Sequence, residues 1–287
     1  ANRAILGITP VSFSNLSDKE IDTRYSAEDV PMVLATEPGV WAYSESGNGT
    51  GYSYVSIRGF DQSRIAVLID GVPLNDNESH QVYWVDHGDI LSDAKNVQIQ
   101  RGIGNSLYGS SAFGGSINLN TQISSENREI EIEMGSGEWN TRKYRARYRS
   151  GNDFGDNLSI SFRTSQIKSD GYRDFHNSKQ NGMFFGLEHR GTKFINQFRA
   201  LIGYENTQLA WDGIYLDDIN DRKKRRFGKK AYTDDFLQKI FSINTFGKLM
   251  ENLFLRNVSY FVSGKGYYET EKSNQDFYSY NLDLNNQ

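Results

Sequence analysis

Apolar and polar residues alternate with a period of two along much of the second half of the chain. Residues 129–134 alternate glutamate with an apolar residue, and residues 143–149 alternate a basic residue with alanine or tyrosine. This alternation predicts β-strands that each have one apolar face. If the two segments form a hairpin, a row of carboxylates lies opposite a row of cations, which is a favourable cross-strand arrangement.

Five further segments show strand patterns, at residues 158–166, 183–189, 194–204, 240–246 and 253–262. Short turns are expected at 151–156, 191–193 and 247–252, and longer connections at 168–179 and 206–236, with the short 135–140 on the same side as the longer ones. A soluble sandwich would show the same alternation, but short turns on one side and longer loops on the other favour a transmembrane β-barrel. Roughly seven strands is an odd number, so we expect this barrel to be incomplete and the chain to be the N-terminal part of a longer protein.

The first part of the chain has a different pattern. Ser26 to Asp29, followed by Val30, Val33 and Leu34, predicts a capped helix that ends before Pro38-Gly39. Residues 55–58 and 64–69 predict strands, and the second is a continuous apolar run, which indicates burial on both faces. We therefore expect an α/β domain over residues 1–122 and antiparallel barrel strands over residues 123–287.

The stretch from 96 to 121, NVQIQRGIGNSLYGSSAFGGSINLNT, predicts a strand, a glycine turn, a short helix over 106–113 and a final strand over 116–121. A glycine turn between a strand and a helix can bind a dinucleotide phosphate. Here Leu107 stands where the third glycine of that motif belongs, and a strand follows too soon for a packed crossover helix. We therefore do not predict a phosphate site.

Composition narrows the function classes. The net charge of −4 and the pI of about 5.7 argue against nucleic-acid binding, and the chain has no cysteine. The basic run at 222–226 lies among aspartates and is interpreted as a solvated loop. No spacing indicates a catalytic triad or a paired-carboxylate pocket, so we expect no enzyme activity. The four histidines, including His80 and His87, lack tight ligand spacing, so we expect neither a metal site nor a cofactor.

Three motifs, in order, resemble the TonB-dependent outer-membrane receptors, in particular those of the siderophore-receptor type. They are VSIRG at 55–59, VLIDGVPLND at 67–76, and the stretch from 97 to 121. The resemblance implies a plug domain inside a barrel of about 22 strands. In that arrangement the glycine-rich stretch returns the plug chain toward the barrel wall. AWDGI at 210–214 is also similar to a surface-loop segment of some iron-siderophore receptors.

The family resemblance implies a function in the outer membrane of a Gram-negative bacterium. It implies import of a scarce, large ligand, most often a ferric siderophore, driven by TonB from the periplasm. Cobalamin, haem, oligosaccharide and peptide remain alternatives, as does a plugged barrel that serves as a subunit of a larger assembly. Other expected partners are outer-membrane lipid and a surface lipoprotein. Residues 1–9 show no clear TonB-contacting segment.

The resemblance also suggests site residues. We expect ligand contacts from plug loops 41–51 and 75–86 and from the long outer loop, through Tyr43, Tyr83, Trp84 and Trp211. For Tyr83 and Trp84, packing between plug and barrel is an equal alternative. The two Arg-Gly motifs contain Arg58 and Arg101, which we expect to pair with carboxylates of the barrel wall.

Overall fold

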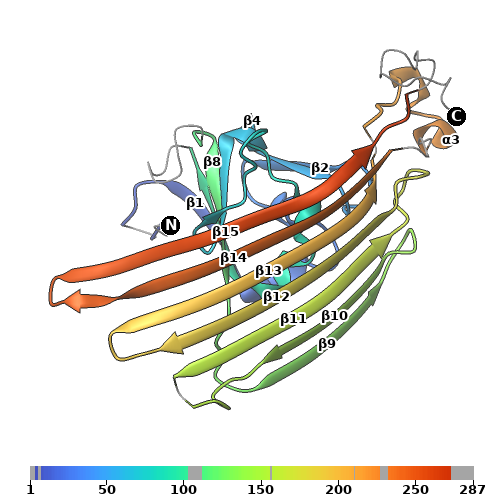
Figure 1. Ribbon diagram of the computed structural model, residues 1–287. Coiled ribbons are helices and arrows are strands. Elements are labelled where there is room, and N and C mark those ends of the chain that lie inside the picture. Colours follow the sequence, from blue (N-terminus) through green and yellow to red (C-terminus); the bar gives the residue numbers. More distant parts are fainter. Residues whose placement is uncertain are drawn as a thin grey trace, which may run out of the picture.

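The computed structural model describes residues 4–5, 8–102, 112–155, 157–209, 211–226 and 232–272. An α/β part, formed by the first 121 residues, lies against one side of a curved antiparallel sheet formed by the remainder (Figure 1). Within these ranges no helix is long and apolar enough to cross a membrane.

The α/β part is built on a five-stranded sheet in the order β1-β7-β8-β5-β6. Its strands are β1 (Ser12–Ser17), β5 (Ile65–Ile69), β6 (Val72–Pro73), β7 (Ala94–Arg101) and β8 (Gly115–Thr121). β5 pairs parallel to β8 and is almost wholly buried, which confirms the expectation from its continuous apolar run. β7 and β8, the two strands predicted in the glycine-rich stretch, pair antiparallel. A Cβ at Gly115 would lie 2.4 Å from the carbonyl oxygen of Gln100, so this position requires glycine. The helix expected over 106–113 falls largely outside the described residues.

Smaller elements surround that sheet. They are a three-stranded sheet of β2 (Val40–Ser44), β3 (Ser53–Ile57) and β4 (Phe60–Asp61), helices α1 (Asp18–Arg24) and α2 (Val30–Leu34), and 3₁₀ turns η1 (Gln62–Arg64), η2 (Trp84–His87) and η3 (Ile90–Asp93). The helix predicted after residues 26–29 is present as α2, with Asp29 at its N-cap, while the Glu28 carboxylate accepts hydrogen bonds from Ser26 and Ala27. α1 was not predicted, although Ser17 and Glu20 form its capping box.

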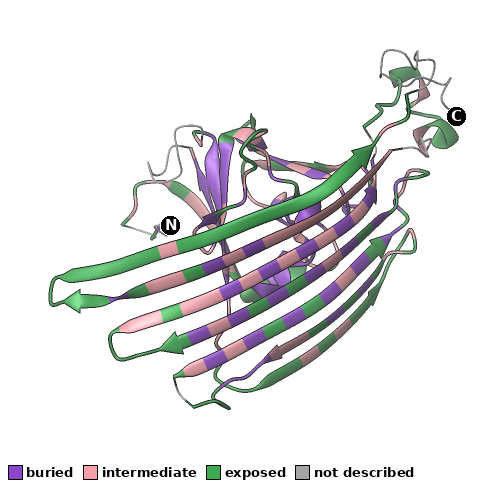
Figure 2. Ribbon diagram, in the orientation of Figure 1, coloured by how far each residue is buried: buried purple, intermediate pink, exposed green. Residues whose placement is uncertain are grey.

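The curved sheet contains seven strands that pair with their sequence neighbours, as the alternation predicted. They are β9 (Glu129–Ser136), β10 (Arg142–Arg149), β11 (Leu158–Ser169), β12 (Ser178–Arg190), β13 (Phe194–Gln208), β14 (Thr233–Met250) and β15 (Leu253–Glu269). Burial alternates along β10 to β13 (Figure 2) because every second side chain faces the α/β part. Phe184, Leu201 and Ile240 of the sheet belong to the same apolar core as β5, β7 and β8.

The connections of the sheet fall into two sets at opposite ends. One end has the turns 150–157, 191–193 and 251–252, and the other has 137–141, 170–177 and 209–232, the last of which contains η5 (Leu216–Asp218) and α3 (Arg222–Arg226). The strands extend further into the predicted long connections than expected, so only 209–232 is clearly longer than the turns at the opposite end. We call the end with 209–232 the outer end.

Candidate functional site

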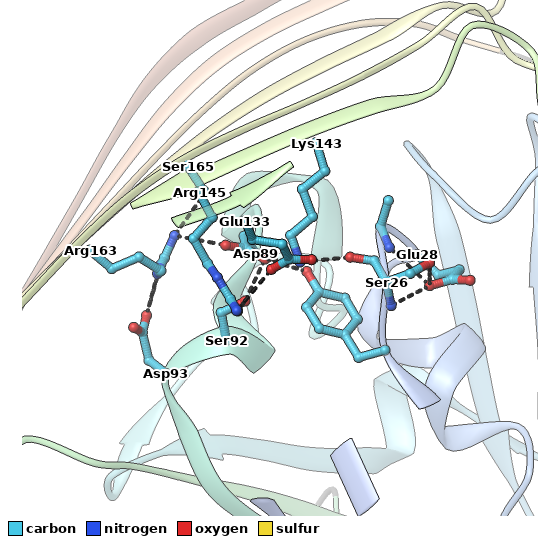
Figure 3. Close-up of polar contacts among 12 residues, drawn as sticks. Ser26, Glu28, Asp89, Ser92, Asp93, Glu133, Lys143, Arg145, Arg163 and Ser165 are labelled. Carbon is cyan, nitrogen blue, oxygen red and sulfur yellow. Dashed lines mark hydrogen bonds and ion pairs between the residues drawn. The ribbon is translucent and has the colours of Figure 1, made fainter. Parts of the chain in front are cut away.

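Two carboxylates of the α/β part are buried against cations of the sheet (Figure 3). The Lys143 Nζ on β10 lies 2.9 Å from Asp89 Oδ1, and the Arg163 guanidinium on β11 lies 3.5 Å from Asp89 Oδ2 and 2.8 Å from Asp93 Oδ2. All four side chains are at most 3% exposed. Because removal of one partner would leave an unpaired charge out of water, these ion pairs fix the position of η3 on the sheet.

The charge ladder of β9 and β10 surrounds this centre. The Arg145 guanidinium lies 2.8 Å from the Glu133 carboxylate, and it also pairs with Glu131 and donates to the Ser92 hydroxyl. Arg147 donates to the carbonyl oxygen of Ser92 at 2.6 Å and pairs with Glu131. The predicted cross-strand rows of opposite charge are therefore present, and their cations also bind η3 directly.

Tyr25 completes the centre from the helical side. Its hydroxyl donates to Asp89 Oδ1 at 2.7 Å, and the Lys143 Nζ lies 4.2 Å from the centre of its ring. Burial opposes the charge on Asp89, but the charges of Arg163 and Lys143, with hydrogen bonds from Ser92 and Lys143, hold its pKa below the ordinary value. Asp89 is therefore ionised and serves as the common partner of this centre.

A second ionic contact joins the other side of the α/β sheet to the curved sheet. Asp70, in the left-handed conformation at the end of β5, lies 3.0 Å from Arg199 Nε on β13. Its carboxylate also accepts from the Thr121 hydroxyl at 2.7 Å, and its carbonyl accepts from Asn244 Nδ2 at 2.8 Å. One residue thus connects β5, β8, β13 and β14.

Between these contacts the two backbones approach closely. A Cβ at Gly203 of β13 would lie 1.7 Å from the carbonyl oxygen of Asp86, and a Cβ at Gly182 of β12 would lie 2.2 Å from that of Gly88. No larger residue fits at either position without displacement of the segment 86–88. The two glycines therefore let η2 lie directly on the sheet.

Toward the outer end, the same interface becomes acidic. Asp86 faces Glu205 and Asp234 of the sheet, and the Tyr52 hydroxyl donates to Asp234. None of the three carboxylates has an ion pair within the described ranges. Burial, and secondarily the charge of Asp234, raises the pKa of Asp86 to about 8. Burial likewise raises the pKa of Asp29, which accepts from Gln180 Nε2 at 3.2 Å, to about 8.

The two arginines of the Arg-Gly motifs lie side by side, both next to Gly39. Arg101 donates to the carbonyl oxygen of Pro38 and to the Ser14 hydroxyl, both at 2.5 Å, and Arg58 is exposed. The prediction placed cations on the α/β part and carboxylates on the barrel strands, which are those of the curved sheet. Where the structure describes both sides, the ion pairs have the opposite polarity, with carboxylates on the α/β part. Pairing of the two arginines with other wall strands stays a prediction.

The predicted aromatic residues divide into surface and core. Tyr43 is 43% exposed and stacks on Tyr54 with ring centres 4.9 Å apart, and the ring centres of Trp41 and Tyr43 are 5.1 Å apart. Tyr83 is 38% exposed and lies edge-on to Tyr52. For Trp84, the structure supports packing between the α/β part and the sheet and contradicts ligand contact. The Trp84 side chain is 2% exposed and packs in the core shared with the sheet.

Trp211 lies in the connection 209–232 and is 47% exposed. Its ring centre is 5.9 Å from Tyr268 and 6.2 Å from Tyr232. The segment 45–52 also reaches this end, since the Tyr172 amide of the connection 170–177 donates to the Ser46 carbonyl at 3.0 Å. The aromatic surfaces at 41–54 and 211 therefore both lie toward the outer end.

Sequence patterns did not single out Asp70, Asp89 or Asp93 as contact residues. Asp70 lies inside one of the three motifs, while Asp89 precedes η3 and Asp93 is its last residue. Buried acids at these positions would indicate buried cations elsewhere in the chain. Within the described part of the chain, no three His, Cys, Asp or Glu side chains are arranged to hold a metal ion.

Comparison with known proteins gives the class of this architecture. Residues 7–116 match the TonB-dependent Receptor Plug Domain. The vitamin B12 transporter BtuB of Vibrio vulnificus is 31% identical over 202 residues, which cover 62% of this chain and 32% of the transporter. The siderophore receptor PiuA of Acinetobacter baumannii superposes with a TM-score of 0.72 at 18% identity, over 92% of this chain and 38% of PiuA. The ferric yersiniabactin uptake receptor FyuA of Yersinia pestis gives 0.71 at 17% identity, over 89% and 41%.

The fold is therefore a plug domain packed against strands of an outer-membrane β-barrel. Its plug domain is that of the TonB-dependent receptors of the Gram-negative outer membrane, and the chain spans about a third of the length of the curated relative above. These relatives are named as transporters and receptors rather than enzymes, which agrees with the expected lack of enzyme activity. We use "plug" for the α/β part and "wall" for the curved sheet from here on.

Proposed function

We propose that residues 1–122 are the plug and residues 123–287 the first wall strands of a TonB-dependent transporter that imports a large metal chelate, with a ferric siderophore as the expected class. The observation that supports a bulky conjugated ligand is the aromatic row of the exposed Trp41 and Tyr43 with the half-buried Tyr54, which leads to the outer end. Rigid aromatic faces with polar edges suit such a ligand. Trp211 in the outer connection is the facing contact, and TonB is the periplasmic partner.

Cobalamin is the second candidate. It is favoured by the sequence relatives, which include BtuB proteins named as vitamin B12 transporters at 26–31% identity. The siderophore receptors resemble this chain in fold alone, at 14–20% identity. Surface lipoprotein partners and a role as a subunit of a larger assembly belong to the same proposal as alternatives.

The test is binding of labelled ferric siderophores and labelled cobalamin to cells that produce the full-length receptor. We expect one ligand to bind, and the double variant Trp41→Ala/Tyr43→Ala to bind it about thirtyfold more weakly, because each of the two lost aromatic contacts is worth on the order of 1 kcal/mol. Tyr215→Ala is the control, since Tyr215 is 83% exposed on the outer connection. Binding unchanged by the double variant, or equally weakened by the control, would exclude the aromatic row as the ligand surface.

A further inference from the structure

The outward surface of the wall has a row of three cations. Arg142 on β10 lies directly opposite Lys168 on β11, and Lys168 lies directly opposite Lys179 on β12. All three side chains are exposed, and none makes an ion pair within the described ranges. Like charges directly opposite one another destabilise a sheet. This row therefore calls for an anionic partner from outside the chain.

The row faces away from the plug. The sequence neighbours of its members point inward: Lys143 reaches Asp89 of the plug, and Gln180 reaches Asp29. Because side chains alternate between the two faces of a strand, residues 142, 168 and 179 face outward. In a barrel wall that direction is the membrane.

The position along the strands is the outer boundary of the membrane. Residue 142 follows the outer connection 137–141, and residues 168 and 179 flank the outer connection 170–177. The next outward row toward the membrane centre contains Tyr144, Gln166, Asn181 and Tyr204. Beyond it, Phe162 faces Phe185. From the outer end toward the membrane centre, the outward rows therefore change from cations to tyrosines and amides and then to phenylalanines. This order matches the change from lipid headgroups to acyl chains.

A hollow of about 490 Å³ lies directly below the cation row. Its outward lining is mainly apolar and includes Met134, Tyr144, Ala146, Thr164, Met183 and Ile202. Ala146 and Thr164, which lie directly opposite each other on β10 and β11, are the small outward side chains of this lining. The nearest acid in the outward rows, Asp235, already accepts from Tyr204 and Asn206 at 2.8 and 2.9 Å. Asp170 follows Lys168 by two residues and makes no ion pair in the described part of the chain.

We propose that Arg142, Lys168 and Lys179 bind the phosphate groups of an outer-leaflet glycolipid of the lipid A class, with acyl chains in the hollow below. Phosphate is the group that Arg and Lys clusters bind most strongly at a membrane surface. A lipid with one anionic headgroup and several acyl chains fits this surface, because the headgroup can contact the three adjacent cations while the acyl chains lie on the apolar surface next to them. The site lies on the opposite face of the wall from the plug and is independent of the transported ligand.

The test is native mass spectrometry of the full-length receptor with added bis-phosphorylated lipid A. We expect the triple variant Arg142→Gln/Lys168→Gln/Lys179→Gln to bind at least about tenfold more weakly, since each cation near an anionic lipid contributes on the order of 1 kcal/mol. The control with the same charge change is Arg222→Gln/Lys223→Gln/Lys224→Gln, at the same end of the barrel but on α3. Equal binding by the triple variant, or an equal loss in the control, would overturn the proposal.

Two further arms separate the lipid from free phosphate and from a folding defect. Dephosphorylated lipid A should bind the wild-type receptor as weakly as lipid A binds the triple variant, and inorganic pyrophosphate should not displace lipid A. Displacement by pyrophosphate would show a free-anion site and would refute the lipid assignment. Ala146→Trp, which keeps all three cations and fills the hollow, should also weaken lipid A binding, and unchanged binding would refute the acyl-chain contact.

Discussion

Asp89 is the single residue on which the plug–wall contacts converge. Its carboxylate accepts from Tyr25 and pairs with Lys143 and Arg163, which come from two wall strands. Each wall cation has a second carboxylate, Glu133 or Asp93. The centre therefore shares charge rather than forming isolated pairs, and the loss of Asp89 leaves two buried cations with reduced compensation.

We expect Asp89→Asn to weaken plug docking by about 3–5 kcal/mol, the usual cost of removing one partner of a buried ion pair. The measurement is protease cleavage of the plug in the full-length receptor, together with the temperature at which the plug unfolds. Asp22→Asn is the matched control, since Asp22 is exposed on α1. A plug as protease-resistant as the wild type would show that the ion centre does not hold it.

Asp86 should make plug docking depend on pH. Its pKa is raised from 3.8 to about 8, so the docked state favours the protonated carboxyl. Docking should therefore weaken as the pH rises from about 4 to about 8 and change little above that range. Asp86→Asn should reduce this loss, as measured by the plug unfolding temperature from pH 4 to pH 9. The same slope in wild type and variant would contradict the assignment.

At the scale of elements, the contact of η2 with β12 and β13 depends on the absence of side chains. A Cβ at Gly203 would collide with the backbone of residue 86. We expect Gly203→Ala to displace η2 and raise plug cleavage by protease, while the barrel still shows heat-modifiable migration on a gel. Gly135→Ala is the control, because a Cβ there meets only the Lys143 Cβ at 3.7 Å. Similar plug cleavage in both variants would refute this steric role.

Strand identities were predictable from sequence because alternation in a barrel wall is imposed by lipid on one face and the plug on the other. The ladder of β9 and β10 was visible for the same reason. The strand ends were not predictable from sequence, because β11 to β15 continue beyond their apolar segments through polar residues that still pair with the neighbouring strands. The sequence could not decide between packing and ligand contact for Trp84 either, since its burial depends on wall residues such as Phe184, Leu201 and Ile240, which lie one hundred residues or more away in the chain.

The sequence also could not predict which side of the plug–wall contact carries the cations and which carries the carboxylates. The motif arginines suggested cations on the plug, but which carboxylate meets which cation depends on how the plug is rotated inside the wall. The wall strands from β10 to β13 receive Asp70, Asp89 and Asp93, while Arg58 and Arg101 make no ion pair with the described wall strands.

At the scale of the whole molecule, the plug is held to this wall by the balanced ion pairs of the Asp89 centre and by the Asp70–Arg199 pair, and it meets uncompensated carboxylates toward the outer end. This asymmetry fits the proposed transport function, in which the plug stays anchored in the barrel while its outer surface receives ligand. Movement of the plug must then be driven, because a ligand can shift the plug only by its difference in affinity between the two states.

The most direct measurement is uptake of labelled ferric siderophore and labelled cobalamin by cells with and without the full-length gene, each repeated with the proton gradient collapsed. For a TonB-dependent transporter, we expect uptake of one ligand to fall on deletion of the gene and to fall equally when the gradient is collapsed. Uptake that is lost on deletion but persists without the gradient, or uptake of both ligands that does not depend on the gene, would contradict that function.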